Sequence, residues 1–265
     1  PALPQAPRNG QYDLGDTPTP AKAAARWNNY LEFGGDRTAW RAAQDLSVHP
    51  WQVRIDGLVE RPLTLDIDQI HRAMPMQERI YRLRCIQKWA FVAPWTGFPL
   101  RALIAHARPL AGARYLRLES FYDPFTAHGQ FKFWHDWPYH EALTRAEAEH
   151  DLAFLATGIY GRPLPKQHGA PLRLLVPWKY GYKSIKAIRR LTFTDRRPDT
   201  FWPTSRPDLY GFWANVHPGV AHPYAPQTHE FLLGTAEVRP TQAYNGYGAF
   251  VADLYKGLAD ERLFI

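Results

Sequence analysis

Proline occurs throughout this chain and limits what the chain can fold into. The 265 residues include 24 prolines and 18 glycines, which are scattered rather than arranged in a repeat. Proline interrupts the hydrogen bonding of helices and of strand ladders, so long uninterrupted elements are disfavoured. The sequence therefore predicts many loops and short strands, and it argues against a helical bundle.

The N-terminal segment differs from the rest of the chain. Residues 1–20 are rich in proline, glycine and polar residues, which predicts an extended arm. A short helix is expected after Thr19, in PAKAAARWNNYLEF. The core is expected to begin near Val48, and no repeat, low-complexity tract or linker interrupts the chain. We therefore expect a single domain over residues 1–265, with residues 1–45 as its N-terminal arm.

Strand and helix patterns alternate after the arm. WQVRIDGLVERPLTLD alternates apolar and polar residues around Gly57, which predicts a β-hairpin. DIDQIHRAMP predicts a short helix, capped by Asp66 or Asp68 and stopped by Pro75. Further strands are expected in ERIYRLRCI, ARYLRLESFY, LRLLVPW and AIRRLTFT, and further helices in PLRALIAHA and YHEALTRAEAEH. The chain is mostly irregular beyond Arg196, and the whole pattern predicts an α+β fold with mixed sheets, short helices and many loops.

The charge balance is basic, with a formal net charge of +7 and a pI near 9.5. A basic chain can bind nucleic acid, an anionic cofactor or an acidic partner, or can simply be kept soluble by its charge. The sequence has no lysine-rich block, and its arginines are spread along the chain, which argues against nucleic acid. It also has no run of about 18 apolar residues, so no membrane-spanning segment is expected.

Most standard catalytic motifs are absent. The chain has no GxSxG elbow, no GxxxxGK[ST] loop, no GxGxxG and no HExxH. His217, His222 and His229 lie in one stretch, HPGVAHPYAPQTH, and could form a zinc site. Their spacing matches no standard zinc pattern, so surface or hydrogen-bonded loop histidines are the favoured interpretation.

Cys85 is the only cysteine, so an intramolecular disulfide is excluded. It can be a small buried hydrophobic residue or a reactive thiolate, since the neighbouring Arg82 and Arg84 are expected to lower its pKa. It ends a strand-like run, and the next segment, KWAFVAPWTGFPL, is expected to be a proline-broken aromatic loop. A thiolate can hold a soft or redox-active metal, but the other ligands must then come from elsewhere, such as an organic cofactor.

A second candidate site lies at residues 167–188, QHGAPLRLLVPWKYGYKSIKAI. Lys179, Lys183 and Lys186 surround Gly181, where a glycine allows close approach to a ligand. Such a loop can bind an anionic group such as a phosphate. The alternative is a solvated basic loop.

Five segments together extend over nearly the whole chain after the arm. They are WNNYLEFG at 27–34, ERIYRLRCIQKWAFVAPWTGFPL at 78–100, RPLPKQHGAPLRLLVPWKYGYKSIKAI at 162–188, YGFWANVHPGVAHP at 210–223 and NGYGAFVADLYKGL at 245–258. This pattern resembles the catalytic subunits of periplasmic, molybdopterin-dependent methionine sulfoxide reductases. That family belongs to the sulfite-oxidase-like group of molybdoenzymes.

The resemblance implies a sulfite-oxidase-type molybdopterin-binding domain with a Mo-molybdopterin cofactor. It implies that Cys85 is the metal ligand and catalytic residue, and that it completes the coordination of a molybdenum held by the pterin dithiolene. The cofactor contacts that the resemblance implies are Asn28, Leu31, Glu32, Ser120, His168, Arg173, Ser184, Ile185 and Lys186.

The chain departs from the family pattern at several of these positions. The family usually has asparagine at the position of His168, threonine at that of Ser120 and glycine at that of Ser184. Protonation of His168 would change the charge near the pterin. Ser184 and Ile185 are expected to act through backbone groups. Gln87 replaces a usual glutamate, which removes a possible proton donor near the metal.

The activity that the resemblance implies is reduction of methionine sulfoxide, free or in proteins, by transfer of the sulfoxide oxygen to molybdenum. Trp89, Trp178 and Tyr180 are the aromatic residues expected to pack against the substrate methyl group. The implied partners are a membrane-embedded haem-containing electron donor and oxidised periplasmic proteins, and the enzyme is expected to be a monomeric catalytic subunit in the periplasm. The alternatives are a sulfite oxidase or another S- or N-oxide molybdoenzyme, or a metal-free binding relative.

Overall fold

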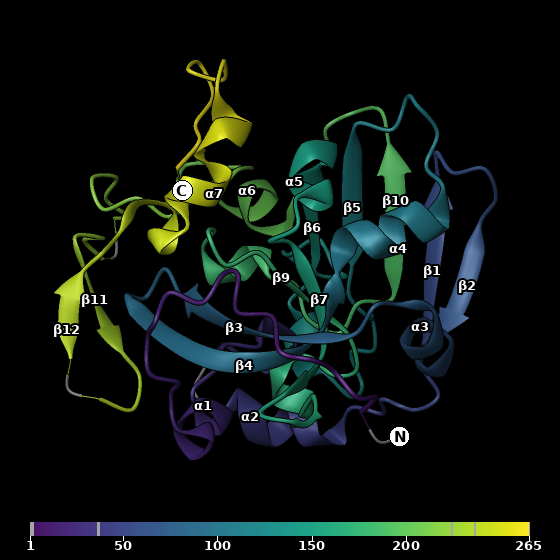
Figure 1. The fold of residues 1–265 in the computed structure, drawn as a ribbon, viewed down its shortest axis with the longest axis horizontal. Coiled ribbons are helices and arrows are strands. Elements are labelled where there is room, and N and C mark those ends of the chain that lie inside the picture. The colour runs from purple at the N-terminus through teal and green to yellow at the C-terminus, as the bar shows by residue number, and fades with distance from the viewer. Residues whose placement is uncertain (1–2, 36–37, 224, 236, 265) are drawn as a thin grey trace.

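Two mixed β-sheets form the centre of the protein (Figure 1). The computed structural model describes residues 3–35, 38–223, 225–235 and 237–264. The first sheet has five strands in the order β2-β1-β10-β5-β6, of which β1 and β10 are parallel and the other pairs antiparallel. These strands are β1 Gln52–Gly57, β2 Leu63–Asp66, β5 Tyr115–Glu119, β6 His140–Thr144 and β10 Arg190–Thr194.

The second sheet has seven strands, of which β3 and β4 run across the upright strands of the first sheet in Figure 1. Its main path is β12-β11-β4-β7-β8, while β3 also pairs with β4 and β9 with β7. The strands are β3 Gln77–Arg84, β4 Trp89–Pro99, β7 Phe154–Ile159, β8 Arg162–Pro163, β9 Arg173–Leu175, β11 His229–Leu232 and β12 Val238–Pro240. One hydrophobic cluster joins the two sheets, with Val53 and Leu118 from the first and Phe98 and Leu155 from the second.

The helices are short. They are α1 Ala21–Arg26, α2 Ala39–Ala42, α3 Ile67–Ala73, α4 Leu100–Ala107, α5 Arg145–Glu149, α6 Phe201–Ser205 and α7 Gly248–Val251. The 3₁₀ turns are η1 Leu31–Phe33, η2 Ala43–Asp45, η3 His128–Phe131, η4 Lys166–His168, η5 Gly181–Lys183, η6 Ala243–Gly246 and η7 Ala252–Tyr255. Over the described residues, no helix has both the length and the apolar character needed to cross a membrane. The predicted α+β class, with mixed sheets and short helices, is confirmed.

The elements with the strongest local patterns form as predicted. β1 and β2 pair as an antiparallel hairpin in which Gln52 lies opposite Asp66. Asp66 then caps α3: its carboxylate accepts from the Gln69 N–H at 2.7 Å, and the Gln69 side chain accepts from the Asp66 N–H at 2.8 Å. Such a reciprocal capping box fixes the start of a helix within a few residues.

The segment after Cys85 differs from the prediction of a proline-broken loop. Trp89–Pro99 is β4, which pairs with β3 on one side and with β7 on the other. A proline is tolerated in a strand where the ladder requires no N–H from it. Pro94 lies opposite the end of β7, where its carbonyl accepts a 2.9 Å hydrogen bond from the N–H of Tyr160. The register also shifts between Thr96 and Gly97.

Two predicted helices are shorter than expected. The helix after Thr19 ends at Arg26, and Trp27 is already extended; the side-chain amide of Asn28 donates back to the Ala25 carbonyl at 3.4 Å, in the way that asparagine competes with helical hydrogen bonds. The segment YHEALTRAEAEH starts as β6, which pairs with β5, and only its second half forms α5. Pairing with a distant strand therefore overrides the local helical pattern there.

The N-terminal segment lies against the second sheet. Residues 3–20 contain no helix or strand, but the N–H of Thr19 donates to Val92 of β4 at 2.8 Å and the N–H of Glu78 donates to Pro7 at 2.9 Å. Residues 1–2 and 36–37 of the predicted arm, 1–45, lie outside the described residues.

Candidate functional site

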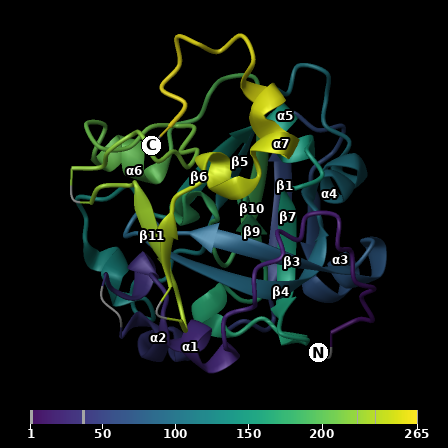
Figure 2. The same ribbon diagram turned by 60° about the vertical axis from the view of Figure 1, so that its left-hand side comes forward.

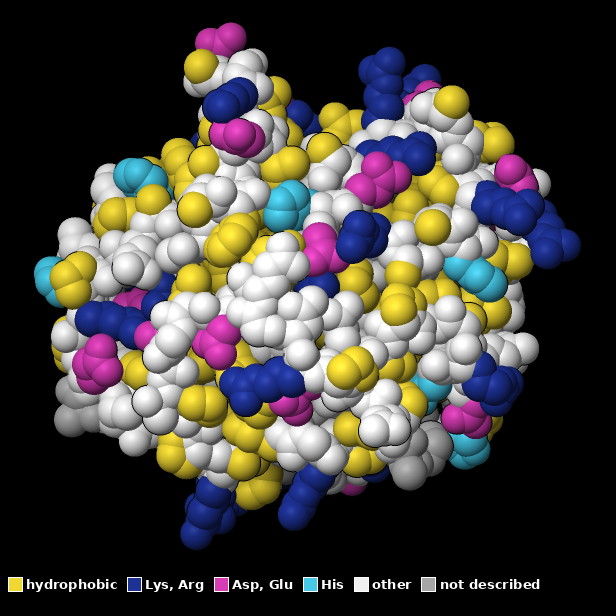
Figure 3. All heavy atoms as spheres, in the orientation of Figure 1, with side chains coloured by type: hydrophobic (Ala, Val, Ile, Leu, Met, Phe, Trp, Pro, Cys, Tyr) yellow, Lys and Arg dark blue, Asp and Glu magenta, His cyan; other side chains and the backbone are white. Residues whose placement is uncertain are grey.

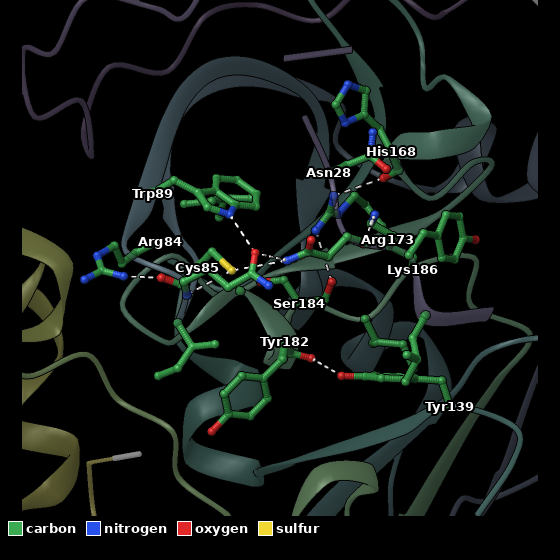
Figure 4. A pocket seen from close by; sticks show the side chains of 18 of the residues that line it. Asn28, Arg84, Cys85, Trp89, Tyr139, His168, Arg173, Tyr182, Ser184 and Lys186 are labelled. Atoms are coloured by element: carbon green, nitrogen blue, oxygen red, sulfur yellow. Dashed lines mark hydrogen bonds between the residues drawn. The ribbon is translucent and has the colours of Figure 1, made fainter. Parts of the chain in front are cut away.

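A cavity of about 310 Å³ lies beside the turn that joins β3 to β4 (Figure 4). Its walls come from residues 27–32, the strand ends around Cys85, the segment 168–186, and side chains near α6. Nine of the ten predicted site residues line it: Asn28, Leu31, Glu32, Cys85, His168, Arg173, Ser184, Ile185 and Lys186. The fold thus brings together segments that are up to 158 residues apart, from Asn28 to Lys186.

Cys85 presents its sulfur to this cavity from a tight turn (Figure 4). The Cys85 N–H donates to the Trp89 carbonyl at 2.8 Å, and the Lys88 N–H donates to the Cys85 carbonyl at 3.0 Å. The thiol is half-buried, and its Sγ accepts from the Asn29 side-chain amide at 3.3 Å and from the Gln87 N–H at 3.4 Å. The sulfur therefore has polar neighbours on the cavity side, which a purely packing cysteine does not need.

The guanidinium groups of Arg82 and Arg84 are engaged with partners other than the thiol. Successive side chains of a strand point to opposite faces, so these arginines lie on the face of β3 opposite to Leu83. Arg84 borders the cavity, but its guanidinium is directed away from the sulfur (Figure 4). Arg82 pairs with Asp16 at 2.9 Å and Arg84 with Glu230 at 2.8 Å. The guanidinium of Arg84 also donates to the Cys85 carbonyl rather than to its sulfur. Both guanidinium groups pair with carboxylates, and the prediction that they lower the thiol pKa stays a prediction.

Arg173 and Lys186 are the cations that face the cavity. Arg173 is 4% exposed and donates to the carbonyls of His168 and Ser184, both at 3.0 Å. Lys186 donates to the carbonyls of Asn29 at 2.7 Å and Gln167 at 3.0 Å. No salt bridge to either cation forms within the part of the chain that the structure describes. Arg173 is buried and Lys186 half-buried, and neither is neutralised by a salt bridge, which favours an anionic ligand.

Burial is the main cause of the pKa shifts of both cations. Burial lowers the pKa of Arg173 to about 10. Burial also lowers the pKa of Lys186 well below its ordinary value, and the charge of Arg173 adds to this, while Glu32 and Cys85 oppose it. The thiol is thus close enough to Lys186 to interact with its charge. A bound anion would relieve the repulsion between the two cations.

Glu32 is the one carboxyl group among the described lining residues. Burial raises its pKa to about 7, against the opposing effects of its own backbone, the Lys186 charge and a hydrogen bond from Ser120. Ser120 is not among the residues of the cavity wall but contacts Glu32, and the Ala187 carbonyl, 3.3 Å from its hydroxyl, is a second acceptor for the same O–H. Of the predicted site residues, Ser120 alone therefore does not line the cavity.

His168 is neutral in this environment. Its ring is 3% exposed and packs 6.3 Å from the ring of Phe91 and 6.3 Å from that of Trp95. Burial, together with the charges of Lys186 and Arg173, lowers the pKa of His168 to about 3. At neutral pH His168 is therefore unprotonated and adds no charge to the site.

The backbone donors expected at Ser184 and Ile185 are already engaged. The Ser184 N–H donates to the Gly181 carbonyl at 3.1 Å, and the Ile185 N–H donates to that of Lys183 at 3.0 Å. The Ser184 hydroxyl accepts from the Val176 N–H at 3.1 Å. These residues shape the wall and hold Arg173. Lys186 donates to two carbonyls, and the third N–H of its ammonium group is the donor that this segment can offer to a ligand.

Lys179 and Lys183 belong to buried ion pairs and not to an anion site. Lys179 pairs with Glu147 at 2.5 Å and Lys183 with Glu141 at 2.7 Å, and all four side chains are at most 2% exposed. Both interpretations of the basic loop, an anion site of three lysines and a solvated loop, are wrong for these two residues. Their acidic partners come from β6 and α5, which the local sequence does not reveal.

The aromatic wall was only partly predictable. Trp89 lines the cavity, but Trp178 and Tyr180 are buried elsewhere, with the indole of Trp178 donating to the Tyr255 hydroxyl at 2.7 Å. The other aromatic lining residues are Trp27, Tyr30, Phe91, Tyr139, Tyr182, Trp202 and Tyr210. Trp27, Asn29 and Tyr30 lie inside WNNYLEFG, a segment that matches the family, so they could have been predicted as residues of the cavity wall.

The three histidines of the 217–229 stretch form no metal site. Within the described ranges, no group of three His, Cys, Asp or Glu side chains is arranged to hold a metal ion. His217 packs 4.5 Å from the ring of Phe264, and His222 packs 5.4 Å from that of Tyr210. The interpretation as hydrogen-bonded loop histidines fits His217, which accepts from the Gly219 N–H at 3.1 Å, and His229, which lies 3.1 Å from the Thr228 hydroxyl. His222 is instead buried, at 4% exposed.

Polar atoms in the cavity wall remain available to a ligand. The amide oxygen of Asn28 and the hydroxyls of Tyr30 and Tyr182 are buried without a hydrogen-bond partner among the described residues. Buried polar atoms are normally satisfied, so such atoms at a cavity indicate contacts made by a bound group. Together with one soft thiol and two cations, they fit an anionic organic cofactor that has polar edges and carries a soft metal.

Known proteins share this chain's sequence over most of its length. The model of the family described as "Oxidoreductase molybdopterin binding domain" matches residues 41–202. The chain is 42% identical to "Protein-methionine-sulfoxide reductase catalytic subunit MsrP" of Burkholderia mallei, over 98% of this chain and 80% of that protein. It is 43% identical to the protein of the same name from Ralstonia nicotianae, over 100% of this chain and 82% of that protein. The sulfane dehydrogenase SoxCD of Paracoccus pantotrophus has 23% identity and a TM-score of 0.48, over 57% of this chain and 40% of that one.

Proposed function

Because the chain belongs to the molybdopterin-binding oxidoreductases and, within them, to the protein-methionine-sulfoxide reductase catalytic subunits, we propose that Cys85 is the protein ligand of its molybdenum. The enzyme is a molybdenum-dependent reductase of methionine sulfoxide, and the predicted molybdopterin-binding fold is confirmed. The observation that carries the ligand assignment is the position of the sulfur, at the wall of a cavity where Arg173 and Lys186 form no salt bridge with another described residue.

The residues of the cavity fit the parts of a molybdopterin. Arg173 and Lys186 would hold its anionic group, since both are desolvated and positively charged. Asn28, Tyr30 and Tyr182 would supply hydrogen bonds to its polar edges. When bound, the cofactor supplies the two-electron oxygen-atom transfer chemistry of sulfoxide reduction.

The chain's own residues set the environment of that chemistry. The aromatic side chains of the wall exclude water, and Trp89 and Trp202 offer ring surfaces to the apolar part of a sulfoxide substrate. Reduction of a sulfoxide consumes two protons as well as two electrons. Glu32, with a pKa raised to about 7 by burial, can hold a proton at neutral pH, whereas Gln87 cannot titrate.

A direct test combines metal analysis with an activity assay. The purified protein is expected to contain molybdenum and pterin and to reduce methionine sulfoxide with an artificial electron donor. Cys85→Ser is expected to lose the activity, whereas Leu110→Ser, an exposed change before β5, is expected to keep it. A Cys85→Ser enzyme with full activity would overturn the ligand assignment.

The electron donor and the location extend the proposal. A single cysteine excludes iron–sulfur ligation by this chain, so the electrons come from a partner. We propose a membrane-embedded haem protein and action in the periplasm, on the basis of the family resemblance. The net charge of +7 supports electrostatic docking, although Lys and Arg are interspersed with Asp and Glu on the face in Figure 3. Electron transfer that is independent of ionic strength would contradict such docking, and recovery of the protein in the cytoplasmic fraction would contradict the location.

A further inference from the structure

The connection between β5 and β6 exposes an unusual set of aromatic side chains. In residues 121–137, here called the aromatic loop, the exposed fractions are 89% for Phe133, 83% for Phe125, 63% for Trp134, 61% for Tyr122 and 53% for Phe131. These five account for most of the large hydrophobic side chains exposed in the described part of the chain. Such a concentration on one segment marks an interaction site.

The aromatic loop is ordered from within. The side chain of Gln130 is 2% exposed; it donates to the Phe121 carbonyl at 2.8 Å and accepts from the Asp123 N–H at 2.7 Å. The indole of Trp137 donates to the Lys132 carbonyl at 3.0 Å. A buried polar frame therefore holds the backbone while the aromatic rings face solvent. The rings are therefore exposed on a loop with a defined conformation, and not because the loop is disordered.

The aromatic loop also borders the cavity on two sides. The backbone of Gly129 is so close to η1 that a side chain there would meet the carbonyl oxygens of Leu31 and Glu32. At its other end, the ring of His135 lies 6.0 Å from that of Trp202. Leu31, Glu32 and Trp202 all line the cavity. In Figure 2 the loop, in teal, lies between α6 and α2 at the left-hand edge.

We propose that the aromatic loop is the docking surface for the polypeptide on either side of an oxidised methionine in a protein substrate. This inference rests on the proposed function. Methionine occurs mostly in apolar surroundings, and its oxidation disrupts those surroundings and exposes them. A sulfoxide that enters the cavity from a protein brings its chain neighbours to the rim. Exposed Phe and Trp side chains at that rim can bury apolar neighbours.

The charge of the aromatic loop favours a polypeptide over a membrane surface. Segments that bind anionic lipid combine aromatic residues with several lysines or arginines. Between Tyr122 and Asp136 the loop has one such cation, Lys132, against two carboxylates, Asp123 and Asp136. The surface is therefore nearly neutral and apolar, which suits an apolar peptide and gives no attraction to an anionic bilayer.

The test compares two sulfoxides with the same molybdenum-loaded enzyme and an artificial electron donor. One is free methionine sulfoxide, and the other is a synthetic peptide with one methionine sulfoxide flanked by leucine and phenylalanine. Phe133→Ser, Trp134→Ser and the double variant are expected to lower kcat/KM for the peptide by about tenfold or more, mainly through KM. The value for free methionine sulfoxide is expected to stay unchanged. Leu110→Ser is the matched control, because Leu110 is 43% exposed and precedes β5, whereas the loop follows it.

Each outcome decides the inference. Unchanged peptide kinetics in the double variant would overturn it, as would an equal loss with both sulfoxides, which would mean that the loop shapes the cavity itself. Unchanged peptide kinetics with weaker vesicle binding would assign the loop to a membrane. A second measurement uses wild-type enzyme with peptides whose flanking residues are serine: their kcat/KM is expected to fall to that of the double variant. A loaded wild-type enzyme that reduces neither sulfoxide would contradict the proposed function instead.

Discussion

The side-chain amide of Asn29 lies 3.3 Å from the sulfur of Cys85 and 3.3 Å from the side-chain oxygen of Gln87. The indole of Trp89 donates to the same oxygen at 3.3 Å. Asn29 therefore links the sulfur to a small hydrogen-bonded group at the mouth of the β3–β4 turn. A neutral donor to a thiolate stabilises its charge and fixes its direction without adding a proton that can be lost.

Removing that donor is expected to impair catalysis more than metal binding. We expect Asn29→Ala to keep its molybdenum but to lose about tenfold in kcat, the scale at which hydrogen bonds to metal ligands act. Metal analysis and steady-state kinetics on the same preparation measure both quantities. Loss of molybdenum in parallel with activity would contradict the positioning role and indicate that Asn29 is needed to retain the cofactor.

Arg173→Lys is expected to reduce cofactor retention. The guanidinium reaches the carbonyls of His168 and Ser184 at the same time, and a single ammonium group cannot reproduce that fork. We expect about a tenfold or greater loss of cofactor affinity, measured as molybdenum per protein after dialysis. Arg189→Lys, at an arginine that stacks 3.5 Å from the ring of Trp51 outside the cavity, is the control that should retain the metal. An Arg173→Lys variant that retains as much molybdenum as the wild type would show that a positive charge at this position is sufficient to hold the cofactor.

His168→Asn is expected to leave the pH profile of activity unchanged between about pH 5 and pH 8. The pKa of His168 is lowered to about 3, so the side chain is neutral across that range. Because the folded pKa lies below the unfolded value of 6.5, the wild type loses stability as pH falls from 6.5 toward 3, and the variant should lose less. Activity assays and acid denaturation test the two statements. A wild-type ionisation near pH 6.5 that disappears in the variant would contradict the neutral assignment.

Glu32→Gln is expected to change how stability depends on pH. The pKa of Glu32 is raised to about 7 from 4.5, so the folded state binds more protons than the unfolded state between these values. Stability of the cofactor-free wild type should therefore decrease as pH rises from 4.5 to 7, by at most about 3 kcal/mol. Urea denaturation across this range measures the effect, and the glutamine variant should show a flatter curve. Identical curves would mean that Glu32 does not ionise in this window.

The sequence predicted the features that depend on near neighbours. The β1–β2 hairpin and the Asp66 cap of α3 follow from periodicity and from residues three positions apart, and both are present. The family resemblance also located nine residues of the cavity wall, because each of them lies in a sequence segment that matches the family.

The errors occur where a distant segment decides the environment. The sequence predicts an anion site at Lys179 and Lys183 because their partners, Glu147 and Glu141, are far from them along the chain. Arg84 could have been placed correctly from the chain alone, since neighbouring residues of a strand face opposite sides. The aromatic wall near α6 could not, because no local pattern places Trp202 beside Cys85.

Side chains alternate between the two faces of β3, so the position of the thiol depends on the number of residues in the strand as well as on the presence of Cys85. Cys85 follows a strand whose ladder with β4 runs from Gln77 opposite Gly97 to Arg84 opposite Ala90. A slip of one residue in that ladder would reverse which side chains face the cavity. Deleting a single residue of β3 is therefore expected to turn the sulfur away and direct a guanidinium inward, so a sequence that still contains the cysteine would have lost the metal ligand that we propose.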